Sequence, residues 1–202
     1  MDLPQPKAGD QRRENIRKAA YRCFAESGYH DTTVDAICAA AGISKGSFYW
    51  AYPSKQEVFV DILDTWGREV MDELHDQFEA AVNSANYVEA ITEALIRETR
   101  RGRHMLPLWF EFAAAAKHEP QLEGALARYY GRARTAIAEI LRPVVAGPLD
   151  EEALQGVAAA VFGTYLGLMA QDLSDRETAD AITAIRRVMG VLRPWLEQGY
   201  PR

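Results

Sequence analysis

The sequence predicts an all-α protein, with a small N-terminal three-helix domain followed by a larger helical bundle. Three observations support this fold class. Apolar residues recur at helical spacing in most segments between residues 11 and 198. Most prolines fall between these segments or at their starts, as at Pro53, Pro107 and Pro120. A chain of 202 residues is also long enough for one or two domains with a sizeable core.

The chain begins with a polar leader and a basic helix. Residues 1–9 contain Pro4, Pro6 and Gly9, so we expect them to be disordered, and their polarity argues against a signal peptide. The helix over residues 11–27 has an apolar stripe on one side. Its other face is basic and either binds phosphate groups or is simply solvated; the sequence leaves both interpretations open. The basic residues are Arg12, Arg13, Arg17 and Arg22.

Residues 32–55 predict two short helices joined by a tight turn. Thr33 precedes an apolar-periodic run as an N-cap does, and Gly42 can end that helix in a left-handed conformation. Ser44 caps the second helix, and Phe48 faces the core. This arrangement is a helix-turn-helix, in which the N-terminal residues of the second helix meet base edges in the major groove. The alternative is a structural pair of capped helices, which occurs in many helical proteins.

The run A-A-G-I-S-K-G-S-F-Y, followed by P-S-K, resembles the N-terminal domain of the TetR (tetracycline repressor-like) family over residues 11–58. The chain departs from the family pattern at Trp50, where His is frequent, and at Tyr52, where Phe is frequent. The resemblance implies phosphate contacts at four positions, which are Thr33, Ser47, Tyr49 and Lys55. It implies that four others lie on or beside the helix end facing the groove, which are Ser44, Lys45, Gly46 and Trp50.

The remainder of the chain predicts six further helices. The first, residues 55–83, is about 40 Å long at roughly 1.5 Å per residue and can connect the N-terminal domain to the rest. Pro143 to Pro148 reads as a linker before the last two helices. The predicted helices are 55–83, 87–101, 107–117, 120–141, 151–173 and 177–198.

The last two helices carry more apolar surface than one core-facing stripe requires. Small residues such as Gly163 and Gly167 lie beside large apolar ones in residues 151–173, and residues 177–198 have two apolar rows. This predicts a homodimer through these helices, as the family resemblance also implies; the alternative is a central core helix within one chain. The apolar run 156–170 is expected to be too short and too interrupted to span a membrane.

The distribution of charge and the two cysteines indicate which partners and which metal sites to expect. The net charge is −6, but residues 1–55 carry +2 and the remainder −8, which suits a nucleic-acid contact confined to one end; such an imbalance also arises by chance. Cys23 and Cys38 are predicted to be buried free thiols. No C-x-x-C is present, so we expect no metal site.

Catalytic motifs are absent from the sequence. H-E-x-x-H, G-x-S-x-G, Walker and G-x-G-x-x-G patterns are missing, and no histidine has Glu three residues before it. We therefore expect no enzyme activity and no cofactor. Two alternatives are kept: an enzyme built in the bundle around Trp66, Trp109, Tyr129 and Glu111, and an architectural DNA-binding protein without an effector.

The resemblance implies a cytoplasmic, ligand-responsive regulator, most often a repressor, with DNA-binding residues 1–53 and an effector-binding and dimerisation domain at 54–202. A dimer would bind a palindromic double-stranded operator, and a small effector would change the spacing of the two N-terminal domains through the helix at 55–83. Aromatic residues would suit a hydrophobic effector, although any single one can equally be plain core. The candidates are Trp66, Trp109, Phe112, Tyr129, Phe162 and Tyr165.

Overall fold

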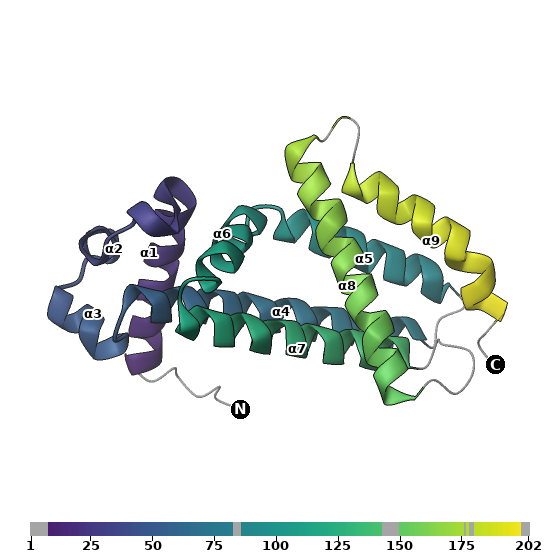
Figure 1. The fold of residues 1–202 in the computed structure, drawn as a ribbon, viewed down its shortest axis with the longest axis horizontal. Coiled ribbons are helices and arrows are strands. Elements are labelled where there is room, and N and C mark those ends of the chain that lie inside the picture. The colour runs from purple at the N-terminus through teal and green to yellow at the C-terminus, as the bar shows by residue number, and fades with distance from the viewer. Residues whose placement is uncertain (1–7, 83–85, 143–149, 176, 178–179, 199–202) are drawn as a thin grey trace, which may run out of the picture. The chain divides into compact units, whose positions relative to one another are not determined.

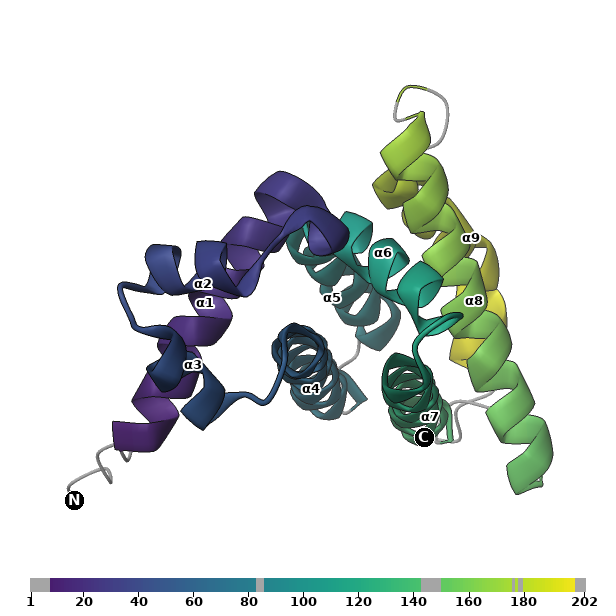
Figure 2. The ribbon, with the colours of Figure 1, turned by 60° about the vertical axis from the view of Figure 1, so that its left-hand side comes forward.

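The computed structural model describes residues 8–82, 86–142, 150–175, 177 and 180–198, and within them the protein is entirely helical (Figures 1 and 2). The all-α prediction is confirmed. The helices are α1 Ala8–Asp31, α2 Val34–Ala41, α3 Lys45–Ala51, α4 Lys55–Val82, α5 Tyr87–Gly102, α6 Leu106–Ala116, α7 Pro120–Leu141, α8 Glu151–Ser174 and α9 Ala181–Gln198.

Two predicted boundaries are wrong. Helix α1 begins at Ala8, so the last two residues of the expected disordered leader are helical, and residues 1–7 lie outside the described residues. Helix α9 begins at Ala181 rather than at residue 177. Asp180 caps it, because its Oδ2 accepts a hydrogen bond from Thr183 N at 2.9 Å. The predicted linker at 143–148 also lies outside the described residues.

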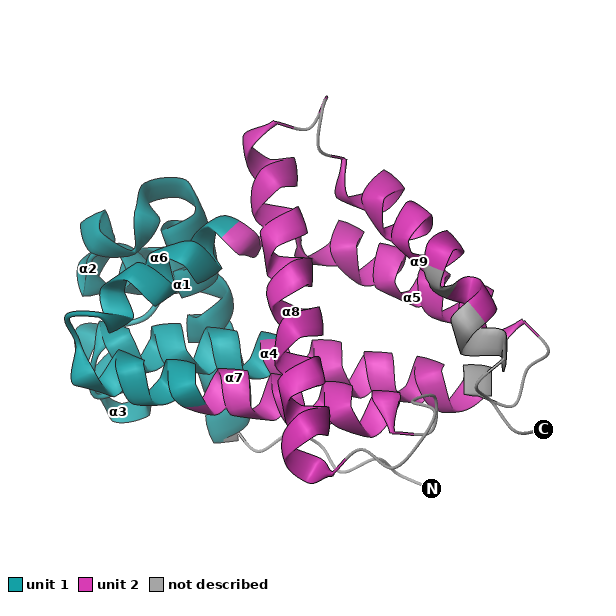
Figure 3. Cartoon of the chain, turned by 45° about the vertical axis from the view of Figure 1, so that its right-hand side comes forward, with its two compact units in different colours: residues 1–66, 107–127 teal, residues 67–106, 128–202 magenta. Residues whose placement is uncertain are grey.

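The chain forms two compact units (Figure 3). One comprises residues 1–66 and 107–127, and the other residues 67–106 and 128–202. The first unit therefore combines the predicted helix-turn-helix with most of α6 and the start of α7. The predicted boundary between residues 53 and 54 does not coincide with this division, and an independently folding domain ending there stays a prediction.

Aromatic side chains form the centre of the first unit. Tyr29 stacks on Phe59 of α4 with ring centroids 4.4 Å apart, and Phe24 of α1 meets the same Phe59 edge-on at 5.1 Å. Phe112 of α6 contacts Phe59 from another side at 5.3 Å. All four rings are buried. Buried aromatic pairs contribute about 0.5–1.5 kcal/mol beyond their apolar area, so this cluster holds α6 against the N-terminal helices.

The second unit is held by apolar packing and by surface ion pairs. Val88 and Ile91 of α5 are buried against Met189 of α9. Along the same pair of helices, Arg186 contacts Glu93 at 2.8 Å and Arg193 contacts Glu89 at 2.7 Å. Exposed pairs of this kind contribute little to stability, typically about 0–1 kcal/mol, so the apolar contacts dominate.

Helix α8 corrects one expectation from the sequence. With 24 residues it is long and apolar enough, by length and composition alone, to cross a membrane, whereas the sequence was expected to fall short. Only 22% of its most apolar stretch is buried within the chain. Helix α8 therefore presents an apolar surface that its own chain does not cover.

Candidate DNA-binding site and regulatory contacts

Both helix ends of the helix-turn-helix have the predicted capping geometry. Thr33 is extended, with φ −104° and ψ 158°, and its Oγ1 accepts a hydrogen bond from Ala36 N at 3.1 Å. Gly42 is left-handed, with φ 66°, where a residue with a Cβ would be strained. Ser44 Oγ accepts from Ser47 N at 3.2 Å and so caps α3. These local interactions fix the angle at which α3 leaves α2.

Helix α3 has one buried face and one exposed face. Phe48 and Ala51 are buried, whereas Tyr49 and Trp50 are 53% and 69% exposed. The exposed set contains most of the residues predicted on this helix, and Ser47 is half-buried. The exposed members are Ser44, Lys45, Gly46, Tyr49 and Trp50.

The ammonium group of Lys45 is paired with a carboxylate in the free protein. Its Nζ lies 2.7 Å from Asp35 Oδ1 of α2, and both side chains are mostly exposed. This hydrogen bond, with the attraction of the same carboxylate, raises the pKa of Lys45. Exposed ion pairs are weak, so Lys45 can exchange Asp35 for a DNA phosphate at little cost.

The ammonium group of Lys55 has three carbonyl partners within the protein. Its Nζ donates to Tyr29 O at 2.6 Å, Thr32 O at 2.8 Å and His30 O at 3.3 Å. The group also lies 4.4 Å from the centre of the Tyr29 ring, and burial lowers its pKa. An ammonium has three N–H donors, and here three carbonyls at the end of α1 receive them. This geometry gives Lys55 a structural role, and its phosphate contact stays a prediction.

A joint between α1 and α6 was not predicted from the sequence. Gly28 has φ 79° and ψ 164°, so it interrupts helical geometry near the end of α1. The next residue, Tyr29, donates its backbone N–H to Glu111 Oε2 of α6 at 2.6 Å. Its hydroxyl donates to Glu119 Oε2 at 3.4 Å, and burial together with Glu119 raises the pKa of Tyr29. The available sequence signal was the Gly28-Tyr29 pair, but nothing in the sequence links it to Glu111.

The six aromatic residues predicted to bind an effector divide between the two units. Trp66, Trp109 and Phe112 belong to the first unit, and the latter two are buried. Tyr129, Phe162 and Tyr165 belong to the second, where the Tyr129 and Phe162 rings lie 6.2 Å apart. Burial raises the pKa of Tyr129, and it raises that of Tyr165 to about 12. These observations fit two roles equally well, namely packing in the core and contact with a ligand. They apply to Phe112, Tyr129, Phe162 and Tyr165.

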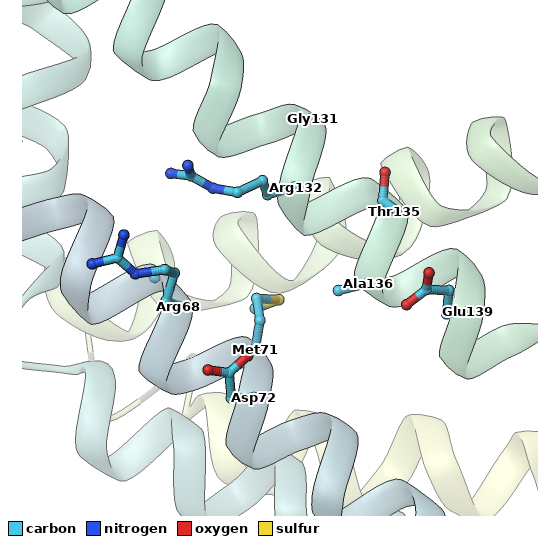
Figure 4. Close-up of a pocket in the computed structure, with 9 residues that line it drawn as sticks. Arg68, Met71, Asp72, Gly131, Arg132, Thr135, Ala136 and Glu139 are labelled. Carbon is cyan, nitrogen blue, oxygen red and sulfur yellow. The ribbon is translucent and has the colours of Figure 1, made fainter. Parts of the chain in front are cut away.

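A pocket of about 410 Å³ lies between α4 and α7 in the second unit (Figure 4). It contains none of the six predicted aromatic residues. The guanidinium groups of Arg68 and Arg132 extend toward the same side, and Asp72 and Glu139 add carboxylates. These residues were not predicted from the sequence, because isolated charged residues on an amphipathic helix are normally assigned to its solvent-exposed face. The lining residues are Gly67, Arg68, Met71, Asp72, Gly131, Arg132, Thr135, Ala136 and Glu139.

Tyr129 packs against Gly67, one of the residues that line this pocket. A Cβ on Gly67 would lie 2.7 Å from Tyr129 Cε2, so the tyrosine ring fills the space that the glycine leaves. Across the described ranges, no group of three or more His, Cys, Asp or Glu side chains could hold a metal ion.

Comparison with known proteins gives two family matches. Residues 16–62 match the family described as bacterial regulatory proteins, tetR family, and residues 84–193 match the BetI-type transcriptional repressor C-terminal domain. The transcriptional regulator BetI of Rhizobium meliloti is 26% identical over 167 residues, 80% of each chain.

Two solved structures share the fold. Salmonella enterica GusR has a TM-score of 0.73 at 21% identity, covering 94% of this chain and 98% of its own. SmeT of Stenotrophomonas maltophilia, solved in complex with triclosan, has a TM-score of 0.64 at 23% identity and 85% coverage of both chains.

Proposed function

Since the chain belongs to the TetR family of bacterial regulatory proteins, with a BetI-type C-terminal domain, it is a helix-turn-helix transcriptional regulator, and we propose that it is a dimeric repressor released from its operator by a small effector. Members of this family are regulators rather than enzymes. A bacterial protein that binds DNA works in the cytoplasm, and we propose that location here.

The observation that carries the operator proposal is the exposed face of α3. Its capped N-terminus carries Lys45 and Gly46, and an added Cβ at Gly46 would be no closer than 3.8 Å to Ser44 Oγ. Helix N-termini favour phosphate groups, and small residues there allow close approach of the backbone. We assign base-edge or adjacent phosphate contacts to Lys45, and groove contacts to Ser44, Gly46 and Trp50.

The phosphate contacts assigned from the resemblance are retained for Thr33, Ser47 and Tyr49. The hydroxyl groups of these three residues can donate to phosphate oxygens. The capping bond of Thr33 is compatible with this, because a hydroxyl that accepts a hydrogen bond can still donate one. We propose that Lys55 positions the end of α1.

A second copy of the chain is the proposed cover for the apolar surface of α8 and α9. Val157 and Val161 of α8 are exposed, as are Val188 and Val191 of α9, the last at 73%. An added Cβ at Gly163 would meet nothing within 4 Å, so the helix surface there is open and shallow. Contiguous exposed apolar surface marks a partner or a lipid contact. The BetI-type match includes this segment, which supports a partner subunit over a membrane.

The proposed effector is a small, largely hydrophobic molecule bound in the second unit near Tyr129, Phe162 and Tyr165. Tyr129 and Phe162 are buried and Tyr165 is half-buried, which supports an apolar site, and the complex of SmeT with triclosan is a precedent on a similar fold. The charged pocket between α4 and α7 lies next to Tyr129 and supplies polar groups that could orient such a molecule. Trp66, Trp109 and Phe112 stay predicted effector contacts.

The proposed switch uses the joint between α1 and α6 as well as α4. Glu111 of α6 holds the backbone N–H of Tyr29, and Lys55 at the start of α4 holds the Tyr29 carbonyl. Both ends of one residue are thus tied to different helices. A shift of either helix on effector binding would therefore move the end of α1 and change the direction of the helix-turn-helix.

The test uses a duplex that the wild-type protein enriches from a random DNA pool. Light scattering should give an even number of chains on that duplex. Triclosan serves as the first probe in a panel of hydrophobic phenols, and its affinity is measured with and without the duplex. Because linkage is reciprocal, the duplex should weaken binding of an effective phenol by the factor by which that phenol weakens duplex binding, about 1–3 kcal/mol of coupling. Equal phenol affinity in both titrations for every bound phenol would favour the architectural alternative.

A further inference from the structure

Trp50 is the more exposed of the two exposed aromatic residues of α3. It lies in the last turn of the helix, and its side chain is 69% exposed. An indole that is exposed on the proposed DNA-binding helix does not contribute to packing of the core. Its contacts within the protein therefore indicate what it does.

The start of α1 packs across the Trp50 ring. The guanidinium carbon of Arg12 lies 5.0 Å from the centroid of the indole, within the range of a cation–π contact. A Cβ placed on Gly9 would lie 3.8 Å from Trp50 Cη2, so the backbone of the first turn of α1 also reaches the ring. The indole thus holds the Arg12 side chain beside the recognition helix.

The other arginines on the basic face of α1 are engaged within the protein. Arg13 Nη1 donates to Ala51 O at 3.1 Å, and Arg17 Nη1 lies 3.5 Å from Asp61 Oδ2. Arg22 Nη2 donates to Ala40 O at 3.5 Å. Within the described parts of the chain, Arg12 is the arginine of this face with no carboxylate or carbonyl partner. Its N–H groups therefore remain available for an external acceptor.

We propose that Arg12 and Trp50 form one phosphate-binding pair at the flank of each operator half-site. A cation–π contact occupies none of the guanidinium N–H groups with a hydrogen-bond acceptor, so they can bind a phosphate in a bidentate manner. The indole also orders a long side chain before DNA arrives, which reduces the entropy lost on binding. Trp50 is a positioning residue in this pair, and Arg12 touches the phosphate. The inference rests on operator binding through α3.

The experiment compares four variants on the duplex enriched by the wild-type protein and on an unrelated duplex of equal length. The variants are Arg12→Ala, Trp50→Ala, the double variant, and the control Lys18→Ala. Lys18 is a matched control because it is an exposed cation of the same helix that pairs with Glu14 at 2.5 Å. Dissociation constants are measured from 50 to 300 mM salt, and circular dichroism verifies the fold.

Arg12→Ala should lower operator affinity about tenfold per half-site at low salt, because a hydrogen-bonded charge pair is lost. It should also reduce the slope of log affinity against log salt by about one per half-site. Trp50→Ala should reproduce much of both effects, and the double variant should be little worse than Arg12→Ala. Lys18→Ala should change neither quantity. A merely structural role for Trp50 would not change the salt slope.

Three results would overturn the pair. Arg12→Ala could bind with the affinity and slope of the wild type. The single losses could multiply fully in the double variant, which would make the two residues independent. Trp50→Ala could change the preferred sequence at an unchanged salt slope, which would make the indole a reader of bases. A wild-type protein that enriches no duplex would instead overturn the operator proposal itself.

Discussion

The carboxylate of Glu98 lies in the interior of the second unit. Its side chain is 4% exposed, and its Oε2 has no hydrogen-bond partner among the described residues. Burial and then the nearby charge of Glu73 raise its pKa, against the weaker effect of Arg101, which lies 4.0 Å from Oε1. Because the folded-state pKa is above the unfolded-state value, the stability this group contributes is present below the unfolded-state pKa. It is lost as the pH rises through the raised, folded-state pKa.

Glu98→Gln should therefore raise the thermal midpoint at pH 7.5, by an amount that shrinks as the pH is lowered toward 4.5. An unsatisfied buried group costs roughly 1–3 kcal/mol, and each kcal/mol shifts the midpoint of a chain of this size by about 2–4 °C. Circular dichroism melts at fixed protein concentration measure the effect. Glu152→Gln at the exposed start of α8 is the control and should give no pH-dependent gain. An equal rise of the thermal midpoint at both pH values for Glu98→Gln would contradict the raised pKa of Glu98 as its cause.

The two lysines of the helix-turn-helix region should separate stability from DNA affinity. Lys55→Ala removes three hydrogen bonds to the end of α1 and should destabilise the protein by at least about 2 kcal/mol. The salt slope of operator binding should stay unchanged. Lys45→Ala should leave the thermal midpoint unchanged and lower the salt slope by about one per half-site, because it removes an exposed cation. The reverse pattern would return the phosphate contact to Lys55.

At the scale of helices, the sequence predicted what is local. The caps at Thr33, Gly42 and Ser44 were predicted because the signal and the hydrogen bond lie within three or four residues of each other. Most helix bounds agree for the same reason, and that of α7 agrees fully. The joint between Tyr29 and Glu111 could not be predicted, since the two residues lie 82 positions apart. The hydrogen bonds of Lys55 and the cation–π contact of Arg12 with Trp50 also depend on tertiary packing.

Two helical glycines should respond in opposite directions to the same substitution. Gly67 of α4 faces the Tyr129 ring, where a Cβ would lie 2.7 Å from one ring atom and 3.1 Å from another. Gly131 of α7 has nothing within 4 Å of an added Cβ. Alanine gains roughly 0.5–1 kcal/mol over glycine in a helix, whereas overpacking a core costs about 1–3 kcal/mol. Gly67→Ala should therefore lower the free energy of unfolding, and Gly131→Ala should raise it.

Denaturant melts of both variants and the wild type measure this pair. Because the intrinsic helix preference is common to both positions, the difference between the variants isolates the contact with Tyr129. Stabilisation of equal size in both would mean that the ring moves aside without loss. Fluorescence of the tyrosine and tryptophan residues provides an independent readout of the displaced ring.

At the scale of the whole molecule, the open question is what covers α8 and α9. Helix α8 is apolar enough to pass a membrane criterion, yet its chain matches a family of transcription regulators over the same residues. The proposed dimer would account for both observations, because the same exposed apolar face would meet its copy around a twofold axis. The proposed dimer would also bring two copies of α3 to one DNA molecule. Each half-site would then benefit from the effective concentration created by the other, which can raise affinity by about 10²–10⁴.

Gly163→Arg should therefore produce a folded monomer that binds the operator weakly. The added side chain meets nothing within 4 Å in the single chain, so the helical content and the core should be preserved. In a dimer through α8 and α9 it would place two uncompensated charges in an apolar contact, which is strongly unfavourable. Glu123→Arg is the control, because it introduces the same side chain at an exposed position of α7 that lies outside these two helices and does not line the pocket. Light scattering at micromolar concentration should give half the wild-type mass for Gly163→Arg and the full mass for the control. Operator affinity should fall only in the first variant, whereas an intact Gly163→Arg dimer would move the subunit contact to another surface.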